Sequence, residues 1–150
     1  MKTLLITTLL LMSGFCLRAQ EETPEIPPDL GKTKFTLLAI SPEKNAPAKW
    51  LENALEKNYK GEYLIIELSE WSKHTDPVKY PYVLLVFDKY TPGSFGAGGR
   101  NAPSVSYSYG VREIATGKTY RWNSAKVNYK NMINDYVKAI EKVRKANSGE

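Results

Sequence analysis

Few side chains in this sequence have the type and spacing that acid–base or nucleophilic catalysis needs. His74 is the only histidine, and it lies in a polar segment close to Asp76. A hydrolase would need such a base beside a nucleophile and an orienting acid, but no Gly-x-Ser-x-Gly motif marks a nucleophile in the sequence. We therefore expect a non-enzyme with a surface histidine, and a hydrolase built on His74 with Asp76 or Asp88 stays an alternative.

The sequence gives equally little support for a metal site or a cofactor site. One histidine and one cysteine cannot supply the usual zinc ligand sets, and the acidic residues lack the spacing of a calcium loop. Gly117-Lys118-Thr119 resembles the end of a phosphate-binding loop, but Arg112 stands where that motif requires a glycine. We expect no metal and no cofactor, and we expect a hairpin turn at Gly117.

A glycine-rich segment from Thr91 to Pro103 is the strongest candidate for binding. It is long for a connection between neighbouring strands, and loops of that length are often functional. Phe95 offers an aromatic anchor and Arg100 offers a cation. The segment is either a binding loop or a mobile tip, depending on whether it closes over a concave pocket or projects into solvent.

Ten tyrosines are many for a chain of 150 residues. Exposed rings would form a platform for a peptide, glycan or small molecule, whereas buried rings would fill the core. Alternation along residues 105–113 places apolar and aromatic side chains on one face, namely Val105, Tyr107, Tyr109 and Val111. The other face carries small and polar residues, namely Ser106, Ser108, Gly110 and Arg112. The candidate binding residues are Phe95, Arg100, Tyr107, Tyr109 and Arg112.

An α+β fold with the element order βαββββα would position these side chains. Short segments rich in β-branched and aromatic residues predict strands at 34–40, 63–68, 82–87, 105–113 and 119–122. Apolar stripes at helical spacing predict helices at residues 47–59 and 125–145. A mixed or antiparallel sheet of about five strands with two helices on one face, a two-layer sandwich, would bury these stripes. The continuous apolar run 82–87 predicts a strand covered on both faces.

The first nineteen residues have the pattern of a cleavable signal peptide, with a positive start, an uncharged apolar stretch and Ala19 before the cut. Cys16 offers the alternative of a lipoprotein, which the bulky Phe15 before it disfavours. We expect a signal peptide at residues 1–19, a disordered Pro- and Glu-rich leader at 20–33, and a single domain at 34–146. The protein would be periplasmic or secreted, and no later segment has the roughly 20 apolar residues of a transmembrane helix.

Charge and cysteine content narrow the classes of partner. The formal net charge is +5, but Lys2 and Arg18 fall in the expected signal, so 19 basic residues remain against 16 acidic ones, leaving +3. Such a mild, interspersed excess predicts solubility rather than a polyanionic partner, and export argues against nucleic acid. Cys16 also falls in the signal, so the mature chain would carry neither a disulfide nor a thiol.

The order of elements resembles the small α/β modules of Gram-negative envelope proteins, of which the amino-terminal domain of the TolB translocation protein is an example. The residues that carry the resemblance are the apolar strand 82–87 and the hairpin 111–120. It implies a binding or assembly role, and it assigns no site residue.

We therefore expect an exported envelope protein that is a non-catalytic binding or assembly module, engaging another protein or a second copy of itself. The alternative is a small-molecule or glycan binder that uses the tyrosines and the glycine-rich segment.

Overall fold

The computed structural model describes residues 23–42, 46–96, 99–122 and 128–149. The expected signal peptide, Cys16, residues 20–22 of the expected leader and the predicted helix start at 125–127 lie outside these residues. The elements in chain order are β1 (Thr36–Ser41), α1 (Ala46–Asn58), β2 (Glu62–Glu67), the short 3-10 helix η1 (Leu68–Lys73), β3 (Tyr82–Thr91), β4 (Ser94–Gly96), β5 (Gly99–Asn101), β6 (Ser104–Glu113), β7 (Thr119–Trp122) and α2 (Tyr129–Ser148).

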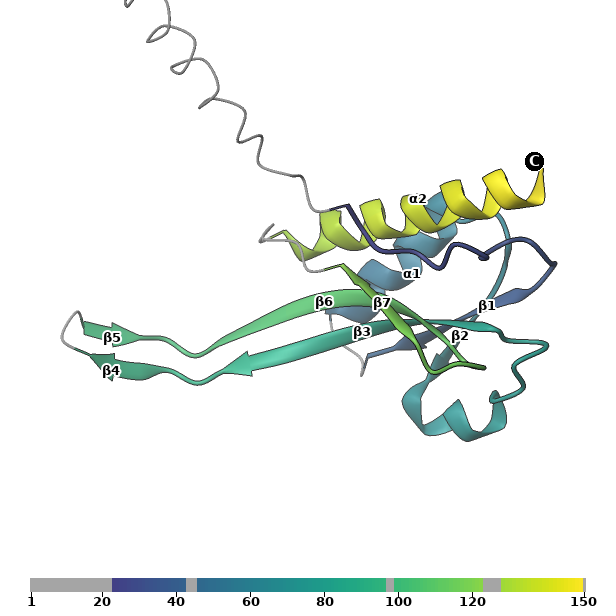
Figure 1. Cartoon of the computed structure of the whole chain (residues 1–150). Helices are drawn as coiled ribbons and strands as arrows, with labels where there is room; N and C mark the ends of the chain where they lie inside the picture. The colour runs from purple at the N-terminus through teal and green to yellow at the C-terminus, as the bar shows by residue number, and fades with distance from the viewer. Residues whose placement is uncertain (1–22, 43–45, 97–98, 123–127, 150) are drawn as a thin grey trace, which may run out of the picture.

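Five of the strands form one mixed sheet in the order β2-β1-β3-β6-β7. Strand β1 runs parallel to both β2 and β3, whereas β3, β6 and β7 are successively antiparallel. Helices α1 and α2 pack against each other over one face of this sheet (Figure 1). The predicted class, an α+β sandwich with a five-stranded sheet and two helices on one face, is confirmed. Gly117, in the turn between β6 and β7, has the left-handed φ of +71° that a tight hairpin turn favours.

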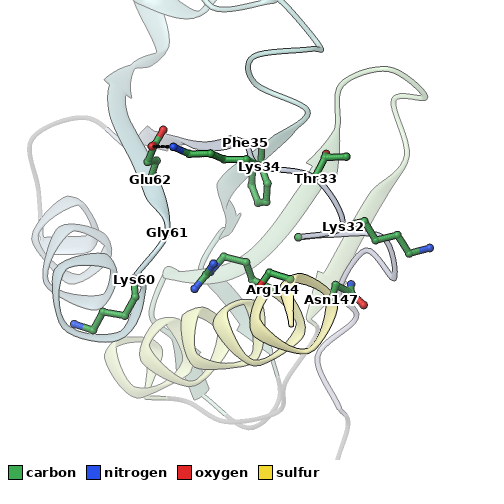
Figure 2. A pocket seen from close by; sticks show the side chains of 11 residues that line it. Lys32, Thr33, Lys34, Phe35, Lys60, Gly61, Glu62, Arg144 and Asn147 are labelled. Atoms are coloured by element: carbon green, nitrogen blue, oxygen red, sulfur yellow. Dashed lines mark ion pairs between the residues drawn. The ribbon is translucent and has the colours of Figure 1, made fainter. Parts of the chain in front are cut away.

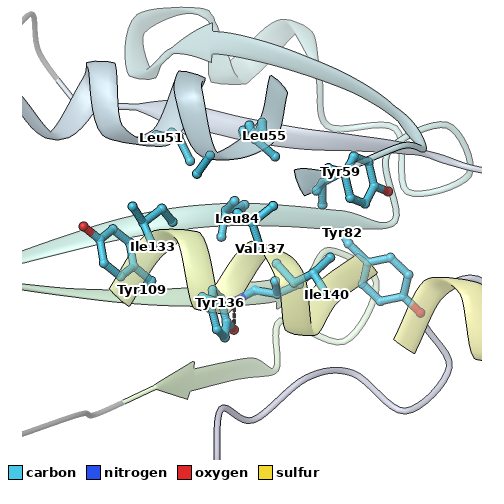
Figure 3. Packing of buried hydrophobic residues seen from close by; sticks show 14 of the residues in the cluster. Leu51, Leu55, Tyr59, Tyr82, Leu84, Tyr109, Ile133, Tyr136, Val137 and Ile140 are labelled. Atoms are coloured by element: carbon cyan, nitrogen blue, oxygen red, sulfur yellow. Dashed lines mark hydrogen bonds between the residues drawn. The ribbon is translucent and has the colours of Figure 1, made fainter. Parts of the chain in front are cut away.

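The main core lies between the helices and the sheet (Figure 3). Alternate sheet residues point towards the helices, including Leu37, Leu84 and Val111, each with no exposed surface. Each helix packs an apolar stripe at helical spacing against these residues. The stripes are Leu51, Ala54 and Leu55 of α1 and Met132, Ile133, Tyr136, Val137 and Ile140 of α2. Burying one such leucine or isoleucine contributes about 1.5–3 kcal/mol, so this stripe largely determines where the helices sit.

A second, smaller core covers part of the opposite face. Leu38, Ile66 and Val83 point away from the helices, and Tyr80 from the β2–β3 connection packs over them with Trp71 beside it. The start of β3 is therefore covered on both faces. This explains why the run from residue 82 is apolar at every position rather than alternating.

Residues 23–33, here called the N-terminal strap, lie along α2 (Figure 1). Leu30 is fully buried in the main core. The Asn147 amide donates to the carbonyls of Pro28 and Leu30, both at 2.8 Å. At Gly31, where φ is +94°, a Cβ would come within 2.6 Å of the Arg144 carbonyl oxygen, so only glycine fits. The expectation of a disordered leader is therefore wrong for residues 23–33.

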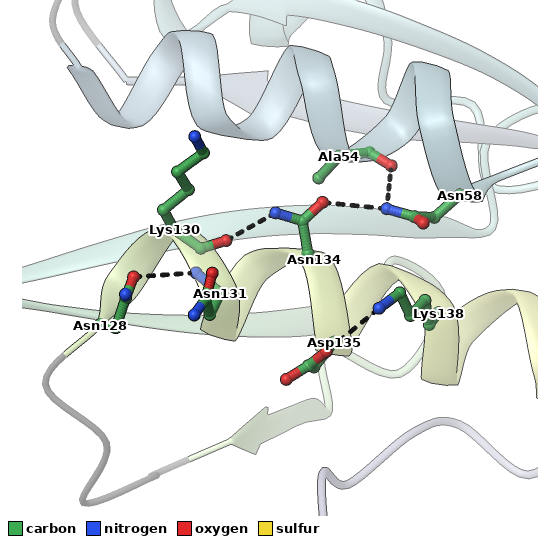
Figure 4. Close-up of polar contacts among 8 residues, drawn as sticks. All are labelled: Ala54, Asn58, Asn128, Lys130, Asn131, Asn134, Asp135 and Lys138. Atoms are coloured by element: carbon green, nitrogen blue, oxygen red, sulfur yellow. Dashed lines mark hydrogen bonds and ion pairs between the residues drawn. The ribbon is translucent and has the colours of Figure 1, made fainter.

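Amide side chains connect the two helices and cap one of them (Figure 4). Asn58 of α1 donates to the side-chain oxygen of Asn134 on α2 at 3.0 Å and also to the Ala54 carbonyl at 3.1 Å. At the start of α2, the Asn128 side chain accepts from the Asn131 backbone N–H at 3.1 Å, as a helix N-cap does. These bonds fix the relative position of the helices along their shared apolar seam.

The hydroxyl of Tyr136 joins α2 to two strands and to the strap. Val111 of β6 and Tyr120 of β7 are partners in the ladder, and the hydroxyl lies between their facing backbone groups. It accepts from the Val111 N–H at 3.0 Å and lies 2.9 Å from the Tyr120 carbonyl oxygen and 3.1 Å from that of Glu25. Burial raises the pKa of Tyr136, so the hydroxyl keeps the proton that it donates.

We predict that Tyr136→Phe lowers the free energy of unfolding by about 1–3 kcal/mol, because the Val111 N–H and its facing carbonyl would be left buried without a partner. Urea denaturation of the variant and the wild type measures the loss. Tyr63→Phe is the matched control, since Tyr63 is 37% exposed. Equal losses in the two variants would contradict the assignment of this role to the Tyr136 hydroxyl.

Candidate functional site

The outer part of the β3–β6 hairpin extends away from the rest of the domain. The two strands pair from Tyr82–Glu113 out to Thr91–Ser104, but β1 pairs with β3 only at Val83 and Leu84. Strand β7 pairs with β6 only at residues 109–112. Beyond these contacts the hairpin runs well past the helices, and β4 and β5 continue it at the tip (Figure 1). We call residues 86–108 the arm.

The arm replaces the long loop that was expected at residues 91–103. Pairing breaks at residues 92–93 and 102–103 and resumes beyond them in a separate two-stranded sheet, where Ser94 faces Asn101 and Gly96 faces Gly99. The expected loop therefore contains a short ribbon of two strands. The segment projects from the body of the domain and does not close over a pocket.

Both long edges of the arm carry backbone groups that no described strand pairs with. The Val111 N–H points towards β7, so the backbone groups of Tyr107 and Val105, at alternate positions, point to the same side. On β3 the corresponding outward residues are Val86 and Asp88, on the side where β1 has already ended. Each edge thus presents donors and acceptors at the spacing that an added strand would use.

An aromatic cluster lies where the arm joins the domain. The Tyr107 ring makes edge-to-face contacts with Trp50 of α1 at 6.4 Å and with Tyr129 of α2 at 5.2 Å between ring centroids. All three rings are half-buried. Val105, two residues further out on the same face, is 44% exposed. Rings of this kind, apolar with a polar tip and only partly covered, suit contact with another molecule.

The structure separates the five predicted binding residues. Phe95 and Arg100 are backbone partners at the tip, and Tyr107 lies at the base of the arm. Tyr109 is fully buried, and its hydroxyl donates to the Tyr129 carbonyl at 3.0 Å, so it belongs to the core. Arg112 is exposed on the face opposite the helices. The five residues therefore do not converge on one site.

His74 is half-buried at the edge of the second core. Its ring packs edge-on against Tyr80 at 5.3 Å, and its Nδ1 atom has no hydrogen-bond partner among the described residues. The neighbouring Asp76 carboxylate accepts from the Val78 backbone N–H at 2.9 Å, which stabilises a turn. Asp88 lies on the arm. In the described part of the chain, no acid orients the imidazole as a catalytic base would require.

Two further features bear on function. Within residues 23–42, 46–96, 99–122 and 128–149, no group of three or more His, Cys, Asp or Glu side chains is placed to hold a metal ion. Neither of the long helices in the same residues combines the length and the apolar character that crossing a membrane requires.

A cavity of about 460 Å³ opens at the other end of the domain, between the strap, the start of β2 and the end of α2 (Figure 2). Basic residues line it, but acids neutralise most of them. Lys32 pairs with Asp29, and Lys34 pairs with Glu62 at 2.8 Å. Arg144 pairs with Glu141, so Lys60 alone of the basic lining residues forms no ion pair within the described residues, and the uncompensated charge of the cavity is small.

The ion pair between Glu141 and Arg144 is the structural feature beside this cavity. Arg144 donates to both carboxylate oxygens of Glu141, at 2.9 and 3.1 Å, and both side chains are about 10% exposed. Burial on its own would raise the pKa of Glu141. Hydrogen bonds from Arg144 and from the Lys60 backbone N–H, with the nearby positive charges, nevertheless hold that pKa below its usual value. The pair was missed from sequence, although both residues continue the buried stripe of α2.

Comparison with known proteins gives little further guidance. No protein-family model matches the chain, and no curated protein matches it. Two solved structures of a PelC dodecamer from Paraburkholderia phytofirmans are similar. One, a point variant, is 13% identical with a TM-score of 0.43, over 79% of this chain and 96% of that chain. The other is 14% identical with a TM-score of 0.41, over 79% and 94%. Likeness at this level establishes neither a shared fold nor a shared function.

We predict that Glu141→Gln lowers the free energy of unfolding at neutral pH by about 3 kcal/mol, since Arg144 would keep a buried charge without its partner. A lowered carboxylate pKa adds stability above the unfolded value, and this is lost as the pH falls through the folded value. The difference between variant and wild type should therefore shrink as the pH drops below the ordinary 4.5.

Urea denaturation over a series of pH values measures this difference. Glu62→Gln is the control, because it removes an acid from an exposed ion pair and should change stability little at any pH. A Glu141→Gln loss that stayed constant into the acid range would contradict the assigned role of the carboxylate.

Proposed function

We propose that this chain is an exported, non-catalytic binding module that engages another protein, or a second copy of itself, through the arm. The observation that carries the proposal is the extension of β3 and β6 beyond every other strand of the described sheet. A long ribbon with two open edges is an aggregation hazard in a protein that does not use it. Strand addition to such an edge is a common mode of protein recognition.

The aromatic cluster at the base of the arm supports the same proposal. Tyrosine and tryptophan are enriched at the centres of protein interfaces, where they contribute a large share of the binding energy. Trp50, Tyr107 and Tyr129 come from three different elements, and the Tyr107 ring contacts each of the other two edge-to-face. A partner strand along the arm would bring its side chains next to these rings.

A glycan or small-molecule binder is the second candidate. Tyr109 is buried and cannot contribute to a tyrosine platform. Such a ligand would therefore bind to Tyr107 together with Trp50 and Tyr129. Arg100 lies at the tip, several ladder positions from Tyr107. A thermal-shift screen of glycans against wild type and Tyr107→Ala distinguishes this candidate, which requires a stabilising ligand whose effect disappears in the variant.

Shortening the arm tests the main proposal. We predict that replacing residues 92–103 by an Asn-Gly turn, which suits a two-residue hairpin, changes the free energy of unfolding by less than about 0.5 kcal/mol. The same variant keeps the edges at Val86, Asp88, Val105 and Tyr107 but loses the outer part of the ribbon. It should therefore capture a partner from the envelope fraction of its own cells more weakly than the wild type does, or self-associate more weakly in sedimentation velocity.

Val78→Ser is the matched control, since it removes an exposed apolar side chain from the connector rather than from the arm. It should behave like the wild type in both assays. A shortened variant that binds as the wild type does would contradict the role of the arm. A wild type that captures nothing and stays monomeric at all concentrations would contradict the proposed function as a whole.

A further inference from the structure

The face of β3, β6 and β7 that points away from the helices carries positive charge without negative charge. Alternation places on this face Val83, Leu85, Phe87 and Lys89 of β3, Ser106, Ser108, Gly110 and Arg112 of β6, and Thr119 and Arg121 of β7. Three of these residues are basic and none is acidic. We call Phe87, Lys89, Arg112 and Arg121 the cationic face.

One arginine on this face is held in place by the residues around it. The Arg121 guanidinium lies over the Phe87 ring, 4.2 Å from its centroid. Gly110 makes this possible, because a Cβ there would come within 3.1 Å of the Phe87 ring, 3.3 Å of the Arg121 side chain and 2.8 Å of the Tyr120 carbonyl oxygen. Stacking on the ring leaves the edge of the guanidinium, with its N–H donors, available for a carboxylate.

The positive charges of this face have no acidic partner within the described residues. Lys89, Arg112 and Arg121 form no ion pair there, unlike Lys34 or Arg144. The nearest acids in the sequence are engaged or turned away. The Glu113 carboxylate accepts from the Thr116 hydroxyl at 2.7 Å, and Asp88 alternates to the helix side of β3.

From this arrangement we propose that the cationic face binds an acidic, extended segment of the protein partner, whose carboxylates pair with Arg121, Arg112 and Lys89. Residues 87 and 89 belong to the arm, so the face is continuous with the element proposed to hold the partner, and the inference rests on that proposed function. Alternate residues of an extended peptide are about 6.6 Å apart, the same spacing as alternate residues of β3. Arg112 lies opposite Val83, Arg121 is level with Leu85 through Gly110, and Lys89 follows four residues further on, so the cations on the three strands are separated along the strand direction by multiples of two residues. A peptide with acids at every second position has the same repeat.

Fluorescence anisotropy with a labelled peptide of alternating glutamate and threonine tests the proposal. The wild type should bind this peptide and not the version with lysine in place of glutamate. Arg112→Gln with Arg121→Gln should weaken binding by about tenfold. Phe87→Leu keeps every charge but removes the stack, and should weaken binding by about threefold.

The matched control is Lys49→Gln with Lys142→Gln, which removes the same charge from exposed positions on α1 and α2 and should change affinity by less than about twofold. An equal loss in the control pair would show attraction to net charge alone and would overturn the proposal. Tighter binding of a uronic acid polymer than of the peptide would also overturn the proposal.

These experiments distinguish a failure of the inference about the cationic face from a failure of the proposed function of the arm. The arm-shortened variant keeps Lys89, Arg112 and Arg121, so it should bind the peptide as the wild type does even though it captures the partner more weakly. A wild type that captures a partner through the arm but does not bind the acidic peptide would overturn the inference about the cationic face and leave the proposed function standing.

Discussion

The hydroxyl of Tyr136 is the single group on which the arrangement of helix, sheet and strap most depends. It stands between two strands of the sheet, where a direct ladder bond would otherwise join Val111 to Tyr120. It also lies within hydrogen-bonding distance of the Glu25 carbonyl oxygen in the strap. Because a hydroxyl has one proton and a short reach, these contacts allow α2 little freedom to slide over the sheet.

Helix α2 is also held in place near its C-terminal end. Arg144 and Glu141 form a buried pair there, and the Arg144 backbone packs so closely on Gly31 that no side chain fits at that position. A buried ion pair adds little net stability compared with apolar residues of the same size, but breaking it is costly. Strand β6, which receives the Tyr136 bond at Val111, continues outward as one side of the arm. The base of the arm is therefore held by the best-anchored part of the fold.

Much of this architecture follows from patterns within single elements. The alternation of residues 105–111 correctly placed Tyr107 and Tyr109 on one face, and the stripe from Ile133 to Ile140 correctly predicted a helix against the sheet. What the pattern could not show was how far the helices reach along the strands. Tyr109 lies under α2 and is buried, whereas Tyr107, two residues further out, is only half covered.

The errors arise where distant parts of the chain supply the missing contacts. The strap has a composition typical of disorder, yet Leu30 enters the core and Asn147, more than a hundred residues away, binds its carbonyls. The glycine-rich segment lacks strong strand formers, and its two short strands pair with each other beyond a break in the preceding ladder. Alternation within residues 105–113 shows that one face of β6 is small, but it cannot show that Phe87 from the neighbouring strand packs against Gly110 there.

Amide hydrogen exchange measured by NMR can show whether a well-anchored base holds an arm whose long edges pair with no other described strand. We expect the Val111 amide, which donates to the Tyr136 hydroxyl, to exchange as slowly as the neighbouring Gly110 amide in the β3–β6 ladder. The Asp88 amide on the outer edge should exchange rapidly in the monomer. Rapid exchange at Val111 would show that the Tyr136 hydroxyl does not anchor β6, and strong protection at Asp88 in a monomer would show that the edge of the arm is not open.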